Sequence, residues 1–105
     1  SPSDAILSKR LESQVGRQVY YSLLRTGTVN ADPEIQEYIQ AIGMELVAHS
    51  RVTDQRFTFF VVNNSVINAF AFPGGYIGVL VGGSFERWFG HAPEVDEALR
   101  RAVLG

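Results

Sequence analysis

A Pro-Gly-Gly turn at residues 73–75 is the feature that most constrains how this chain can fold. It separates two short apolar runs, 66–72 and 76–81, which have the length and the aromatic or β-branched content of strands. Proline presets the backbone for the first turn position, and glycine adopts a left-handed backbone without strain. The pattern therefore predicts two strands with a tight turn between them. A P-loop is not indicated, because its lysine is missing.

Helices are predicted on both sides of this strand region. Apolar residues recur at spacings of mostly four over 4–24, and those of 35–46 follow the i, i+3, i+4, i+7 pattern of one helix face. Asp32-Pro33-Glu34 is a strong start signal for the second helix, which we expect to end near residue 49. Pro93 opens a last helix that runs to the end of the chain.

The predicted fold class is α+β. A further strand is expected over 57–62, followed by turn residues at 63–65, and an irregular aromatic stretch is expected over 84–92. We therefore expect two amino-terminal helices packed on a small antiparallel three-stranded meander, and then a carboxy-terminal helix. With 105 residues, of which 46% are hydrophobic and 19% charged, the chain is expected to form a single domain over 1–105.

Composition excludes several classes of function. The net charge of −2, without a run of like charges, argues against a nucleic-acid partner or a polybasic membrane anchor. No apolar run approaches the ~20 residues that a transmembrane helix needs. Because the chain has no cysteine, a disulfide scaffold, a thiolate zinc site and a cysteine nucleophile are all excluded.

Metal and nucleophile motifs are also missing from the sequence. A catalytic zinc needs three protein ligands, two of which a protease helix supplies as His-Glu-x-x-His. The two histidines, His49 and His91, do not begin such a motif, and Pro93 breaks helical spacing after His91. A Gly-x-Ser-x-Gly elbow is absent too. We predict no catalytic residue and no metal ligand in this chain.

A peptide-binding edge is the functional hypothesis that the residues themselves allow. A short strand that ends at a tight turn can leave one edge free, and its backbone groups can pair with an extended peptide. This interpretation places Asn68, Ala69 and Phe70 at the site. The structural alternative stays open: Asn68 caps a turn, Ala69 is small because something packs tightly on it, and Phe70 belongs to the core.

The run from Asn68 to Ile77, Asn-Ala-Phe-Ala-Phe-Pro-Gly-Gly-Tyr-Ile, resembles the signature of a zinc metallopeptidase family. This is the HtpX, BepA and CAAX-prenyl-protease-like family, metallopeptidase family forty-eight. Residues 97–105 are similar to the lead-in that comes directly before the family's His-Glu-x-x-His, and 32–43 and 57–62 resemble its BepA-like periplasmic branch. Residues 81–84 and 88–91 depart from the pattern, which puts the cleft beyond the third strand in doubt.

The resemblance implies an incomplete gluzincin-like peptidase domain that ends just before its zinc helix. Zinc is expected for the full-length family enzyme, whereas this truncated chain alone is predicted to be inactive. In the family, the Asn side chain and the Ala backbone hold the main chain of a polypeptide substrate, which assigns these roles to Asn68 and Ala69, beside Phe70.

Three further expectations accompany this assignment. The resemblance implies a bacterial periplasmic location, with the cytoplasm as the alternative. A homodimer through an exposed apolar sheet face is also expected. The rival function is a stand-alone interaction module that binds peptides by strand addition.

Overall fold

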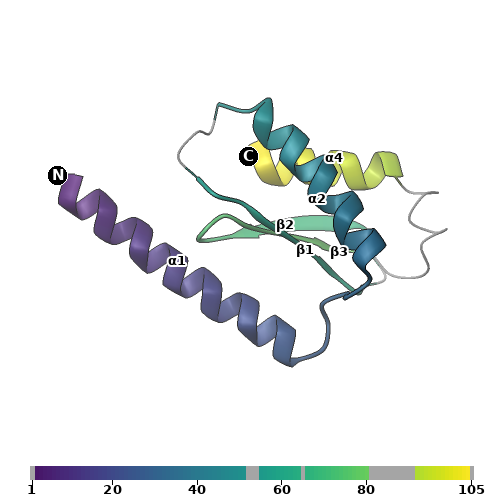
Figure 1. Cartoon of the computed structure of the whole chain (residues 1–105), viewed down its shortest axis with the longest axis horizontal. Helices are drawn as coiled ribbons and strands as arrows, with labels where there is room; N and C mark the ends of the chain where they lie inside the picture. Colours follow the sequence, from purple (N-terminus) through teal and green to yellow (C-terminus); the bar gives the residue numbers. More distant parts are fainter. Residues whose placement is uncertain (1, 52–54, 65, 81–91, 105) are drawn as a thin grey trace.

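The computed structural model describes residues 2–51, 55–64, 66–80 and 92–104 (Figure 1). Within these ranges, three helices and three strands follow one another: α1 (Pro2–Arg25), α2 (Pro33–Ala48), β1 (Thr58–Val62), β2 (Asn68–Phe72), β3 (Tyr76–Leu80) and α4 (Ala92–Leu104). The predicted α+β class is confirmed. Residues 81–91 lie outside the described residues. They include His91, nearly all of the predicted irregular stretch over 84–92, and the two segments, 81–84 and 88–91, that differ from the family pattern.

The sheet order differs from the predicted meander. The strands are arranged β1-β3-β2, with β3 in the centre, parallel to β1 and antiparallel to β2. The prediction of an antiparallel meander was therefore wrong for the first two strands. All three middle residues of β3 are buried, as a central strand requires.

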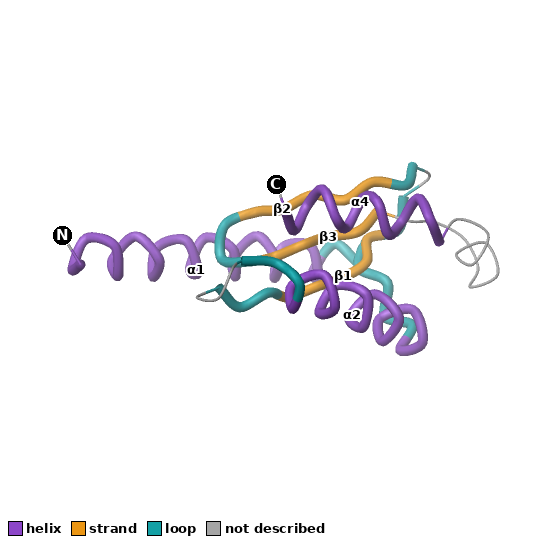
Figure 2. Tube along the Cα trace, turned by 90° about the horizontal axis from the view of Figure 1, so that it is seen from above, coloured by secondary structure: helices purple, strands orange, loops and turns teal. Residues whose placement is uncertain are grey.

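One face of the sheet carries the hydrophobic core. Helices α2 and α4 lie side by side on this face, α2 mainly over β1 and α4 mainly over β2 and β3 (Figure 2). Alternate strand residues point into this layer, as the pleat of a strand dictates. The core cluster consists of Ile35, Ile39, Phe59, Val61, Ile77, Val79, Val95, Leu99 and Val103.

Helix α2 begins where the sequence predicts. The Asp32 side chain accepts a hydrogen bond from the Glu34 amide at 3.0 Å, and Pro33 occupies the first helical turn. The buried Ile35 and Ile39 bring the apolar face of the helix onto the sheet. A good amino-terminal cap and one apolar face thus account for both the start and the orientation of α2.

Helix α1 lies on the opposite face of the sheet and extends beyond it at its amino-terminal end (Figure 1). Its Tyr20 ring stacks on Tyr76 at 5.4 Å and meets Phe60 edge-on at 5.2 Å between ring centroids. Phe60 points away from the face that holds Phe59, so the two predicted amino-terminal helices flank the sheet rather than share one side.

Most of the exposed large apolar side chains among the described residues belong to α1, at Ile6, Leu7, Leu11, Val15, Val19, Tyr21 and Leu24. The predicted homodimer through a sheet face stays a prediction.

No helix among the described residues is long and apolar enough to cross a membrane.

Candidate functional site

The two outer edges of the sheet are covered differently. Beside β1, the Asn30 amide donates to the Val61 carbonyl at 2.7 Å and the Asn63 amide donates to the Thr28 carbonyl at 2.9 Å. A bridge between Val29 and Val62 completes this contact. Among the described residues, β2 pairs only with β3, so its other edge has no strand beside it. The strand singled out from the sequence is thus the edge strand whose outer side has no strand beside it in the described part of the chain.

The three predicted site residues share this strand but do not share a face. Ala69 is paired with Val79, which places it on the side of α4 and the core. Asn68 and Phe70 therefore lie on the α1 side, because successive residues of a strand alternate. Their backbones form one continuous edge, but their side chains do not form one cluster.

Phe70 belongs to an aromatic layer on the α1 side of the sheet. Its ring meets Phe60 edge-on at 5.9 Å and stacks on Phe72 at 5.9 Å between centroids. Gly78 lies opposite Phe70, and a β-carbon there would collide with the Phe70 ring. The Phe70 side chain is thus packed within the fold, and the backbone of this residue is what the edge can offer.

The Ala69 amide is turned toward the open edge. It donates a hydrogen bond to Oδ1 of Asn68 at 2.9 Å. Paired strands lie only about 4.8 Å apart, so a carboxamide has no room between them. In an antiparallel ladder, the residues that face the partner strand alternate with those that face away. The backbone groups of Ala69 and Ala71 are therefore the ones that β2 presents outward.

Helix α4 packs directly against this edge strand. The two side chains that β2 turns toward the helix are those of Ala69 and Ala71, opposite Val79 and Ile77. Small side chains let a helix approach a strand closely. Val95 and Leu99 of α4 are buried in the same core layer. The outward-facing backbone of β2 thus lies next to the helix whose end resembles the lead-in to a zinc motif.

The turn that precedes β3 has the geometry that its sequence predicts. Gly74 and Gly75 have φ values of 94° and 78°, which only glycine adopts readily. The Gly75 carbonyl accepts a hydrogen bond from the Thr58 amide at 2.9 Å, which ties the turn to the start of β1. The turn fixes the register of β2 against β3 and hence the position of the open edge.

The described residues do not form a metal site. They include no group of three or more histidine, cysteine, aspartate or glutamate side chains placed to hold an ion. His49 follows α2 as its carboxy-terminal cap, and its Nδ1 lies 2.8 Å from the Glu45 carbonyl oxygen. The part of the chain described here therefore does not fit a catalytic zinc.

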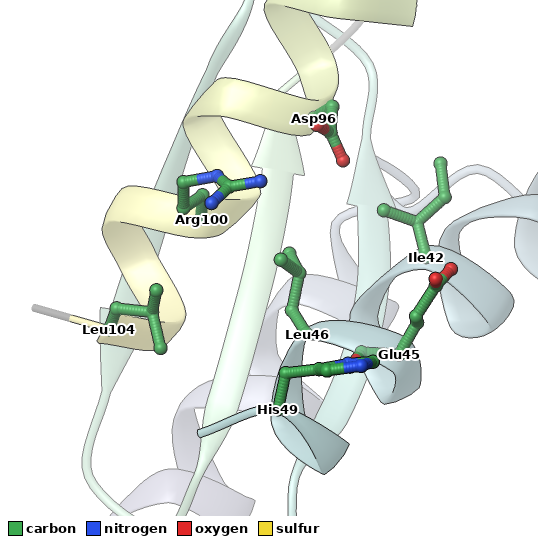
Figure 3. A pocket seen from close by; sticks show the side chains of 7 residues that line it. All are labelled: Ile42, Glu45, Leu46, His49, Asp96, Arg100 and Leu104. Carbon is green, nitrogen blue, oxygen red and sulfur yellow. The ribbon is translucent and has the colours of Figure 1, made fainter. Parts of the chain in front are cut away.

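A groove that the sequence did not single out lies between α2 and α4 (Figure 3). It has a volume of about 480 Å³ and is lined by Ile42, Glu45, Leu46, His49, Asp96, Arg100 and Leu104. The lining positions recur every three or four residues on each helix, which is the only sequence signal that could have indicated it. No β2 residue lines this groove, so it is separate from the open edge.

The part of the chain that contains α2 and the sheet is similar to a known protein family. The family model described as Peptidase family M48 matches residues 33–83, which include α2, all three strands and the turn. The resemblance inferred from the sequence is thereby confirmed over this part of the chain.

Curated relatives agree with the family match. The chain is 39% identical over 71 residues to the β-barrel assembly-enhancing protease of Escherichia coli K12, a match that covers 68% of this chain and 15% of the relative. It is 44% identical over 59 residues to a putative β-barrel assembly-enhancing protease of Vibrio cholerae, covering 55% of this chain and 12% of the relative. The chain thus spans only a small part of the length of these relatives.

Proposed function

We propose that this chain supplies the substrate-binding edge of a zinc-dependent metalloendopeptidase of peptidase family M48. The observation that carries this proposal is the open edge of β2, which lies within the segment that matches the family and rests against α4. A protease must hold its substrate in an extended conformation, and an open strand edge selects that conformation through backbone hydrogen bonds.

A polypeptide substrate would add to the sheet beside β2 as a further strand. The outward amide and carbonyl groups of Ala69 and Ala71 pair with its main chain, so binding depends little on the substrate's side chains. Asn68 lies at the start of this edge with its side chain exposed. Phe70 supports the strand from the α1 side through its ring contacts. We assign Asn68, Ala69 and Phe70 to the binding site in these roles.

The family is generally zinc-dependent, and zinc activates water for attack on a peptide carbonyl. The described residues do not fit the ion, and the sequence contains only two histidines and no cysteine. We propose that the zinc ligands come from outside this chain and that the chain alone does not cleave peptides. Its own contribution is to bind and orient the substrate.

The location that we propose is the bacterial periplasm. It rests on the resemblance to the BepA-like branch and on the bacterial relatives that the chain matches. The test is to express in bacteria the longer protein that we propose contains this chain, called the parent protein below, and to fractionate the cells; we expect the parent protein in the periplasmic fraction. Recovery of the parent protein in the cytoplasmic fraction would contradict it.

A second candidate function uses the same edge without catalysis. Because the backbone groups needed for strand addition all lie within the chain, a stand-alone peptide-binding module is compatible with the same geometry. The two functions differ in whether a bound peptide is cut by the parent protein.

Peptide titration of the isotope-labelled chain tests the binding edge. We expect a blocked hexapeptide of alternating lysine and valine to shift the amide resonances of β2 more than those of β1, whose outer edge is covered by residues 28–30. Ala69→Pro removes an outward amide, which an edge strand tolerates, and should abolish these shifts. Phe70→Pro serves as its control, because it removes an inward amide and should disrupt the sheet. Shifts confined to the α2–α4 groove would contradict the proposal.

A further inference from the structure

The Ala69 amide at the open edge already has a hydrogen-bond partner within its own strand. Oδ1 of Asn68 accepts from it at 2.9 Å, and the alternation of the β2–β3 ladder places this amide at the outer side of β2. A peptide that added to this edge would bring a main-chain carbonyl oxygen to the same amide. The side-chain carbonyl of Asn68 and the main-chain carbonyl of a peptide are both amide oxygens, so they compete for one donor.

We propose that the Asn68 carboxamide is a replaceable cap on the Ala69 amide, which an extended peptide must displace in order to bind. This inference rests on the proposed function, since the displacing ligand is the peptide that adds to β2. The cap gives Asn68 a role in the unbound chain that differs from holding the substrate.

A cap of this kind suits an edge that must stay open. An uncovered edge strand presents unpaired backbone groups that can pair with any extended chain, including another copy of the same protein. A single exposed hydrogen bond shifts an equilibrium by a factor of only roughly two to ten. The cap can therefore weaken chance contacts, while a peptide that forms several backbone hydrogen bonds still displaces it.

The capping is specific to one position of the strand. Ala71 presents its backbone outward like Ala69, but the residue before it is Phe70, whose side chain has no hydrogen-bond acceptor. Ala71 is more exposed than Ala69 as well. A peptide can accordingly pair first beside Ala71 and then displace the cap at Ala69. Ligands long enough to reach both residues are favoured over short ones.

Amide hydrogen exchange of the chain without peptide tests the cap itself. In Asn68→Ala, the Ala69 amide should exchange roughly two- to tenfold faster after correction for the intrinsic rate of each sequence, since it loses one exposed hydrogen bond. The Ala71 amide is the internal reference and should not change. Asn68→Asp keeps an acceptor of the same shape and should keep Ala69 protected. Equal Ala69 exchange in the unmodified chain and in Asn68→Ala would overturn the cap.

Titration of the same three proteins with the blocked lysine–valine hexapeptide tests displacement. We expect Asn68→Ala to bind roughly two- to tenfold more tightly than the unmodified chain, because the competing acceptor is gone. At an ionic strength high enough to screen the attraction between the added carboxylate and the lysines of the peptide, Asn68→Asp should bind no more tightly than the unmodified chain. Weaker binding by Asn68→Ala would show that Asn68 holds the peptide, which overturns the competition but leaves strand addition intact. If no β2 amide resonance shifts in any of the three proteins, both strand addition and displacement are wrong. The hydrogen-exchange experiment then decides separately whether Asn68 protects the Ala69 amide.

Discussion

At the scale of single residues, glycines set how closely the layers of this protein approach one another. Gly43 of α2 faces the Phe59 ring, and a β-carbon at Gly43 would lie 2.5 Å from two atoms of that ring. Both residues are buried. The sequence pattern shows Gly43 only as an interruption of a helix, whereas the fold shows it as the contact between α2 and β1.

Gly43→Ala tests this contact. Alanine favours a helix by about 1 kcal/mol over glycine, but overpacking of a core costs about 1–3 kcal/mol. We expect a net loss of roughly 1 kcal/mol in the free energy of unfolding, measured by urea denaturation. Phe59→Leu in the same chain should make Gly43→Ala less harmful, because the ring no longer occupies the space. Additive effects of the two substitutions would contradict the proposed contact.

The Asn68 and Ala69 pair shows how little of a site's chemistry a motif alone reveals. The sequence placed both residues at a binding edge. It also offered the alternative that Asn68 caps a turn and that the alanine is small because of tight packing. In the structure, Asn68 caps the amide of the next residue of its own strand, not a turn, and Ala69 lies on the side of the helix layer. The role of both residues in binding stays a prediction.

At the scale of secondary-structure elements, α1 is the one most loosely attached to the rest. Its docking depends on Gly16, where a β-carbon would collide with the Pro73 carbonyl oxygen and lie 2.7 Å from the Tyr76 ring. Tyr20, one turn further along, forms the ring contacts on the sheet. Most apolar side chains of α1 are exposed instead of buried.

Gly16→Ala should therefore release α1 from the sheet without unfolding the sheet or the helices α2 and α4. The backbone carbonyl of Pro73 cannot move away easily, because the neighbouring turn is tied to β1 through Gly75. We expect loss of the nuclear Overhauser contacts between Tyr20 and Tyr76, with the amide exchange of β3 unchanged within about twofold. Gln18→Ala, on the exposed side of the same helix, is the control. Persistence of the Tyr20–Tyr76 contacts in Gly16→Ala would show that the helix docks in another way.

Element boundaries were predictable because they depend on local chemistry. The Asp32 cap and Pro33 predicted the start of α2, and the glycines of the turn predicted the end of β2 and the start of β3. Strand order was not predictable in the same way. Whether β2 or β3 lies beside β1 depends on which arrangement buries both faces of β3, and that is a property of the assembled layers.

At the scale of the whole molecule, a helix layer on one side and α1 on the other leave β2 at the rim. The extents of 49 × 32 × 21 Å show an elongated body, and α1 projects beyond the sheet at one end (Figure 1). The edge strand and the helix that resembles a zinc-helix lead-in are brought together by α4 packing on β2. Under the proposed function, substrate binding and peptide cleavage would thus be neighbouring but separable tasks.

Incubation of the chain with zinc and unfolded casein tests this separation. We expect no cleavage above a protein-free control, because the sequence has two histidines, no cysteine and no His-Glu-x-x-His. The parent protein, with and without a chelator, provides the comparison for active enzyme. Metal-dependent, chelator-sensitive cleavage by the chain itself, detected by gel electrophoresis, would overturn the proposed division of roles.

By itself, the sequence determined the elements, the tight turn, the α+β class and the likeness to a peptidase family, because these follow from residues close together in the chain. Only the tertiary structure decided that β3 is central, that α1 and α2 lie on opposite faces, and that the Ala69 amide faces outward. These features depend on which surfaces exclude water together. A local pattern states that a surface is apolar, and only the packed molecule determines which other surface covers it.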